Sequence, residues 1–189
     1  MRSPTRGCGL VDLIVGTFLG LVVLTMLAVG LGSGGRLLAN AGQRGEAEDT
    51  TQLAVEAFAF DARRAGFDPA AVGVDPMIQA QSDRVTFTAD LDGDGVVDAT
   101  SEEKIAYVCN PSLHRLSRIV GSQSLPLADD VIGCALRYVD RSGAPIPVPA
   151  SGLAAADRAR TVAVVLDVSL KPATLMRAVA RTLRVALRR

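Results

Sequence analysis

Tryptophan is absent from this 189-residue chain, and aromatic residues make up only 4% of it. Proteins that bind single-stranded nucleic acid stack bases on aromatic side chains, so this shortage argues against such a surface. Basic and acidic residues are equal in number, 20 of each, and no basic cluster stands out before the C-terminal arginines. The composition therefore argues against nucleic-acid binding in general.

Histidine is almost absent as well, because His114 is the only one. The chain has no His-rich metal motif and no nucleophile elbow of the kind that hydrolases use. Its glycine-rich segments lie in an apolar run and in an acidic loop, and neither matches a phosphate-binding loop. We therefore expect no enzymatic activity, and we expect His114 to be a surface residue on a strand.

The first 35 residues contain a long apolar run. Arg2 and Arg6 precede the run, and no charged residue occurs from Leu13 to Leu31. About 20 apolar residues span a bilayer as a helix, and a basic flank stays in the cytoplasm. The run predicts a single-pass inner-membrane helix with the C-terminal domain in the periplasm. Asp12 stands out, because a carboxylate at the centre of such a helix costs roughly 2.5–3.5 kcal/mol.

The residues leading to this acid read Gly7-Cys8-Gly9-Leu10-Val11-Asp12. This spacing resembles the processing site of type IV pilins and type II secretion pseudopilins. The resemblance implies that prepilin peptidase cuts after Gly7 and that Cys8, in place of the usual Phe, becomes the first residue. It also implies that Asp12, in place of the usual Glu, pairs with the α-amino group of a neighbouring subunit, which is charged at neutral pH.

Beyond the apolar run, Leu53, Ala57 and Phe60 form an amphipathic stripe with Asp61 on the solvent side, and Gly66 ends the helix. The chain after Pro69 shows the alternation and turn signals of β-structure. Strands are expected at residues 84–89, 104–109, 113–120, 131–139 and 161–170, with a strand favoured over a basic helix at 178–187.

The order of segments after the helix adds to the resemblance. The helix end, AFAFDARRAGF, and the segments VTFTADLDGDG, EKIAYV, LHRLSR and PLADDVIGCALRYVDRSG resemble PilW-type minor pilins. The helix end is also similar to that of J-type minor pseudopilins. The resemblance implies an α+β, pilin-like fold, with a long N-terminal transmembrane helix packed on an antiparallel β-sheet. It divides the chain into a leader (1–7), a membrane and filament-core helix (8–35), its amphipathic continuation (36–66) and a periplasmic β-rich domain (67–189).

An acidic loop is the best chemical motif outside the apolar run. Asp90, Asp92, Asp94 and Asp98, with the backbone carbonyl of Val96, match the first part of an EF-hand calcium loop. The twelfth position is Ser101 rather than a bidentate Glu, although Glu102 and Glu103 follow it. The loop therefore predicts either a Ca²⁺ site between two strands or an Asp- and Gly-rich turn without an ion.

Two of the three cysteines, Cys109 and Cys134, lie at the ends of expected strands. In an oxidising compartment they would form a disulfide, and otherwise they would be buried free thiols. The function implied by the resemblance is that of a minor pilin or pseudopilin, with prepilin peptidase and other pilin subunits as partners. The alternative is a signal-anchored, Ca²⁺-binding periplasmic module that does not assemble into filaments.

Overall fold

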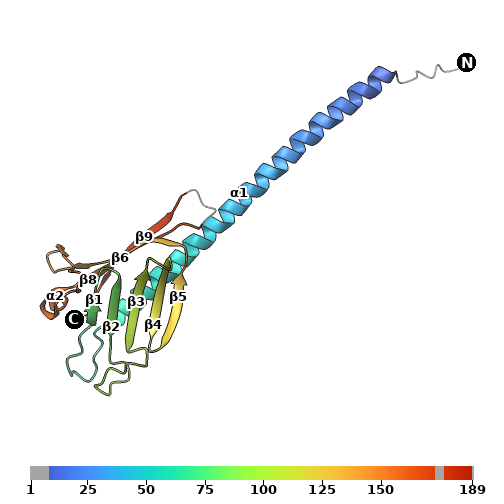
Figure 1. Cartoon of the computed structure of the whole chain (residues 1–189). Coiled ribbons are helices and arrows are strands. Elements are labelled where there is room, and N and C mark those ends of the chain that lie inside the picture. Colours follow the sequence, from blue (N-terminus) through green and yellow to red (C-terminus); the bar gives the residue numbers. More distant parts are fainter. Residues whose placement is uncertain (1–8, 173–176, 189) are drawn as a thin grey trace, which may run out of the picture. The chain divides into compact units, whose positions relative to one another are not determined.

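The computed structural model describes residues 9–172 and 177–188, and its first element is the 55-residue helix α1 (Leu10–Arg64; Figure 1). No proline occurs between Pro4 and Pro69, so no residue in this helix lacks its backbone donor. Asp12 lies in the first turn and two arginines lie in the last, which suits the helix dipole. Gly66, with φ of +75°, follows the helix as the predicted stop, and this prediction is confirmed.

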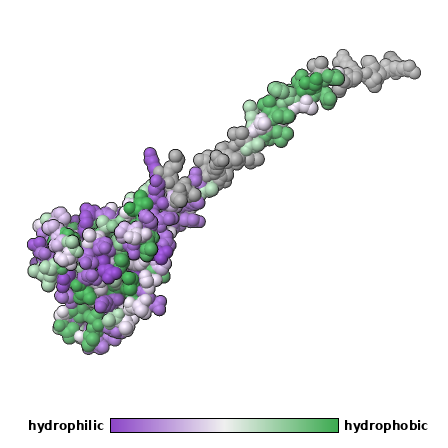
Figure 2. All heavy atoms as spheres, viewed as in Figure 1, coloured by the Kyte–Doolittle hydropathy of each residue, from purple (hydrophilic) through white to green (hydrophobic). Residues whose placement is uncertain are grey.

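The chain divides into two compact units, with the boundary between Gly42 and Gln43, and α1 contributes to both. In the first unit most of the large apolar side chains that the structure describes are exposed, and Figure 2 shows their hydrophobic colouring. They are Leu10, Leu13, Ile14, Val15, Phe18, Leu19, Leu21, Val23, Leu24, Met26 and Leu27. Among the residues that the structure describes, no helix meets the combined length and hydropathy of a membrane span. The prediction of a transmembrane helix is therefore wrong.

Two antiparallel sheets form the frame of the second unit. The first sheet has the order β1-β2-β3-β4-β5, and its strands are Met77–Ala80, Arg84–Thr88, Lys104–Asn110, Arg115–Val120 and Gln123–Ala128. The second has the order β7-β6-β8-β9, with β6 at Val131–Val139, β7 at Pro145–Ile146, β8 at Ala163–Leu170 and β9 at Val179–Ala186. A short helix, α2 (Ala155–Arg160), lies between β7 and β8 along the chain.

The single sheet of the predicted fold class is thus wrong as well, because the chain changes sheets after β5. Asp130, with φ of +57°, lies in the turn between β5 and β6, where the chain passes from the first sheet to the second. β6 pairs with β8 over eight residue pairs, from Val131–Leu170 to Val139–Ala163. Alternation in the sequence marks each strand, but it does not reveal which strand is its neighbour. The strand favoured at 178–187 is confirmed as β9.

The core of the second unit lies between the last turns of α1 and the two sheets. Phe58 is fully buried and makes edge-to-face contacts with Phe87 and Tyr107, at centroid distances of 5.5 and 5.0 Å. Ala54 and Ala62, one turn before and one turn after Phe58, are also fully buried. Small residues on either side of one aromatic ring allow the helix to approach the sheets closely.

The amphipathic stripe predicted for this part of α1 is wrong. Leu53 and Phe60 are 66% and 58% exposed, and Ala57 is half-buried. The buried face is rotated by about one residue, so that Asp61, expected on the solvent side, is 3% exposed. Alanine occurs on both faces of the helix and is small enough to be buried or exposed. Phe58 and Asp61 determine which face is buried, because the side chains that they contact lie on the first sheet.

Three links join the two sheets near the β1–β2 turn. A disulfide connects Cys109 of β3 to Cys134 of β6, with the Cα atoms 5.7 Å apart. The hydroxyl of Tyr138 donates to the carbonyl oxygen of Gln81 at 2.8 Å. The backbone N–H of Leu136 donates to the carbonyl oxygen of Ser82, also at 2.8 Å. These contacts hold the second sheet against one end of the first.

Candidate metal centre

The acidic loop connects two neighbouring strands of the first sheet, β2 and β3. Because β2 and β3 are antiparallel, with Thr88 paired with Lys104, the two ends of the loop meet. The N–H of Ala89 donates to the carbonyl oxygen of Glu103 at 2.9 Å, which places Asp90 next to Glu103. The loop is also tied to the segment after α1, because the N–H of Asp90 donates to the carbonyl oxygen of Phe67 at 2.8 Å.

Three carboxylates meet inside this loop. Asp90, Asp92 and Glu103 each offer an oxygen, and these oxygens lie within 4.8 Å of one another. Asp90 is fully buried and Glu103 is 5% exposed, whereas Asp92 is exposed. Oxygen atoms at such spacing suit a hard cation such as Ca²⁺ or Mg²⁺. The cluster can therefore bind a metal ion.

Backbone N–H groups of the loop point at the two buried carboxylates. Asp90 accepts from Gly93 and Gly95 at 2.7 and 3.0 Å. Both glycines have φ near +80°, which lets the chain wrap around the carboxylate. Glu103 accepts from Asp98 at 2.8 Å and from Leu91 at 2.7 Å, and these bonds hold its pKa below the ordinary value. The carboxylate of Glu103 therefore keeps its negative charge at neutral pH.

Only part of the predicted ligand set comes together. Asp94 instead accepts from the N–H of Val96 at 2.7 Å, and Asp98 accepts from the N–H and hydroxyl of Thr100. The hydrogen bonds from Thr100 lower the pKa of Asp98. Val96 is exposed at the tip of the loop. The cluster instead includes Glu103, the first residue before β3, which the β2–β3 hairpin brings beside Asp90.

Glu103 is the candidate ligand that the sequence did not predict. The sequence signal for it was the pair of glutamates directly after Ser101, where an EF-hand would have its last ligand. Pairing β2 with β3 would have placed one of these two glutamates beside Asp90. Strand alternation alone could not tell Glu102 from Glu103.

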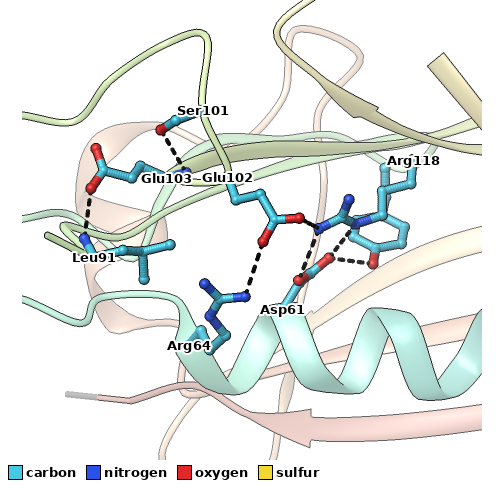
Figure 3. A network of polar contacts seen from close by, with 8 residues as sticks. Asp61, Arg64, Leu91, Ser101, Glu102, Glu103 and Arg118 are labelled. Carbon is cyan, nitrogen blue, oxygen red and sulfur yellow. Dashed lines mark hydrogen bonds and ion pairs between the residues drawn. The ribbon is translucent and has the colours of Figure 1, made fainter. Parts of the chain in front are cut away.

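Glu102 belongs to a polar network that reaches the helix (Figure 3). It contacts Arg64 at 3.5 Å and Arg118 at 3.6 Å. Arg118 also pairs with the buried Asp61 at 2.7 Å, and the hydroxyl of Tyr107 donates to Asp61 at 2.7 Å. Hydrogen bonding to Asp61 raises the pKa of Arg118, and burial together with that carboxylate raises the pKa of Tyr107. Glu103 thus belongs to the carboxylate cluster, and its neighbour Glu102 connects the acidic loop to Arg64 of α1.

The other predicted site residues are placed as follows. Gly7 and Cys8 lie outside the described residues. Asp12 is exposed in the first turn of α1, and Cys109 and Cys134 form the disulfide between the sheets. His114 lies in the turn before β4, not on a strand, with φ of +50° and its Nδ1 atom 3.2 Å from the carbonyl oxygen of Val131.

No protein-family model matches the chain, and no curated protein matches its sequence. The proposals below therefore depend on the sequence motif and on the geometry of the described residues.

Proposed function

We propose that the chain is a structural subunit of a filament, a minor pilin or pseudopilin of a type IV pilus or a type II secretion-like system. The observation that carries the proposal is the exposed apolar surface on the first part of α1, from Leu10 to Leu27. A large contiguous apolar surface is typical of a site that contacts another protein or a membrane. Packing of such helices against those of other subunits would remove the apolar side chains from water.

The position of Asp12 supports the same proposal. It is the one charged residue in this part of the helix, and it is exposed. After cleavage following Gly7, the new α-amino group would lie four residues before it in the chain. A carboxylate of one subunit would then neutralise the amino group of another, and the pair would set the register of the helices.

This proposal assigns partners and a role. Prepilin peptidase would remove residues 1–7, and other pilin or pseudopilin subunits would contact α1. The sheets of the second unit would face outward, and the subunit would act in assembly, initiation or at the filament tip. The disulfide between Cys109 and Cys134 supports an oxidising compartment for this unit.

Mass spectrometry of the mature N-terminus in cells with an active prepilin peptidase tests the processing step. We expect a chain that begins at Cys8, and a chain that retains Met1 would contradict the proposal. Asp12→Ala tests assembly, with Asp12→Glu as the matched control because it keeps the carboxylate. We expect loss of filament incorporation for the first variant and retention for the second. Equal incorporation of both would contradict the role assigned to Asp12, and no incorporation of the wild-type chain would favour a module that does not assemble.

We further propose that the cation bound by the cluster is Ca²⁺. The cluster has two buried carboxylates and one exposed carboxylate, and Ca²⁺ accepts irregular oxygen geometry more readily than Mg²⁺ does. Asp92 would be the entry ligand, because it is exposed. Thermal melts with millimolar Ca²⁺ or Mg²⁺ test this assignment, with Asp92→Asn as the test variant and Asp94→Asn as the loop control. We expect a Ca²⁺-dependent rise in melting temperature that only Asp92→Asn removes. No rise for the wild-type chain would contradict it.

A further inference from the structure

The second sheet carries an apolar cluster on the face turned away from the core. Val139, Ala163 and Val165 are buried in a cluster of their own, separate from the main core, and Val162 packs against them. Residues directly opposite in an antiparallel pair share one face of the sheet. Ala163 pairs with Ala186, and Val165 pairs with Arg184, so β9 extends this face to the sheet edge.

A hollow of about 620 Å³ lies beside this cluster, and two exposed arginines line it. These are Arg141, in the β6–β7 turn, and Arg184, on β9, and neither forms an ion pair among the described residues. Arg137, on the same face, differs because it pairs with Asp167 at 2.5 Å. The floor of the hollow includes the small side chains of Ala163 and Ala186. The hollow therefore offers two uncompensated positive charges around a small apolar floor.

The acidic loop has the opposite character. Residues 90–103 include six acidic residues and no basic one, whereas residues 168–189 include six basic residues and no acidic one. At the tip of the loop, Val96 is 63% exposed between Asp94 and Asp98 in sequence. Both acids are exposed, and their described bonds are to groups of their own loop. No residue of this loop lines the hollow, so the opposite charges do not meet there within one copy.

We propose that the hollow on the second sheet receives the acidic loop of a second copy of this chain. Val96 would contact the alanine floor, Asp94 would pair with Arg184, and Asp98 would pair with Arg141. Each copy has one loop and one hollow, so the contact is head-to-tail and extends to a ring or a linear array. Arginine is enriched at protein interfaces because its planar group binds carboxylates at two points.

This contact goes beyond the proposed filament function, because it needs neither the N-terminal processing site nor the apolar helix. It is also compatible with a metal ion in the loop. The carboxylates assigned to the ion are Asp90, Asp92 and Glu103, whereas the docking acids are Asp94 and Asp98.

Site-directed cross-linking of the full chain tests the proposal. Two differently tagged copies are mixed in a Cys8→Ser background, one with Val96→Cys and the other with Ala186→Cys, and treated with a short bismaleimide. We expect a cross-linked dimer that carries both tags. The control replaces Ala186→Cys by Gln123→Cys, an exposed position on the first sheet, and should give at most a fifth of the yield.

Charge reversal makes the test specific. Arg184→Glu in the copy with Ala186→Cys should lower the yield at least fivefold, and Asp94→Arg in the other copy should restore it. Equal yields at Ala186→Cys and Gln123→Cys, or no recovery in the double reversal, would overturn the proposal. A thermal melt of each variant shows that it folds. A negative result here leaves the filament proposal intact, and retention of Met1 in cells leaves the docking proposal intact.

Discussion

Removal of the Asp61 carboxylate should strongly destabilise the second unit. Asp61 holds two partners at once, the guanidinium of Arg118 and the hydroxyl of Tyr107, both at 2.7 Å. Its side chain is 1% exposed and that of Arg118 is 16% exposed. In Asp61→Ala the arginine keeps only Glu102, at 3.6 Å, as an ion-pair partner, and the buried Tyr107 hydroxyl loses its acceptor.

The magnitude follows from these contacts. Removal of one partner of a buried ion pair costs about 3–5 kcal/mol, because the other charge stays buried without compensation. For a domain of this size, 1 kcal/mol corresponds to roughly 2–4 °C in melting temperature, so Asp61→Ala should lower it by roughly 6–20 °C. Arg118→Met combined with Asp61→Leu should cost much less than the sum of the single changes, because no unpaired charge remains.

Urea unfolding and thermal melts of the full chain measure these free energies. The matched control is Glu48→Ala, which breaks the exposed pair between Arg44 and Glu48 at 2.9 Å on the same helix. An exposed pair contributes at most about 1 kcal/mol, so this control should change little. A cost below about 1 kcal/mol for Asp61→Ala, or additive single changes in the double variant, would refute the reasoning.

Two further predictions concern the acidic loop and the disulfide. Because the folded-state pKa of Glu103 lies below the ordinary value of 4.5, its contribution to stability is present above pH 4.5 and is lost as the pH falls through the folded-state pKa. In Glu103→Gln the melting temperature should decrease less than in the wild-type chain as the pH is lowered below 4.5. The same dependence of melting temperature on pH in both chains would contradict this. Replacement of Cys109 and Cys134 by Ser opens a link between residues 25 positions apart and should cost about 3.5 kcal/mol by loop entropy. A urea midpoint that does not move would show that the loop is already constrained in the unfolded chain.

Several elements of the fold were predictable from local chemistry. Gly66 predicted where α1 ends, and alternation with turn signals predicted β2, β3, β4, β6, β8 and β9. Strands β1, β5 and β7 and helix α2 were missed, and β7 and α2, with two and six residues, give little periodic signal. The division into two sheets was also missed, since it depends on the pairing of β6 with β8 and not on either strand alone.

The candidate metal centre was also predictable from the sequence only in part. The sequence by itself determined that acidic side chains and glycines alternate in one loop, because these residues are adjacent in the chain. It also determined that an apolar run with a single acid lies near the N-terminus. Only the tertiary structure decided that Glu103 joins Asp90 and Asp92, because the β2–β3 hairpin brings together residues that are 13 positions apart. Likewise, Asp61 is buried because Arg118 and Tyr107, far along the chain, compensate its charge.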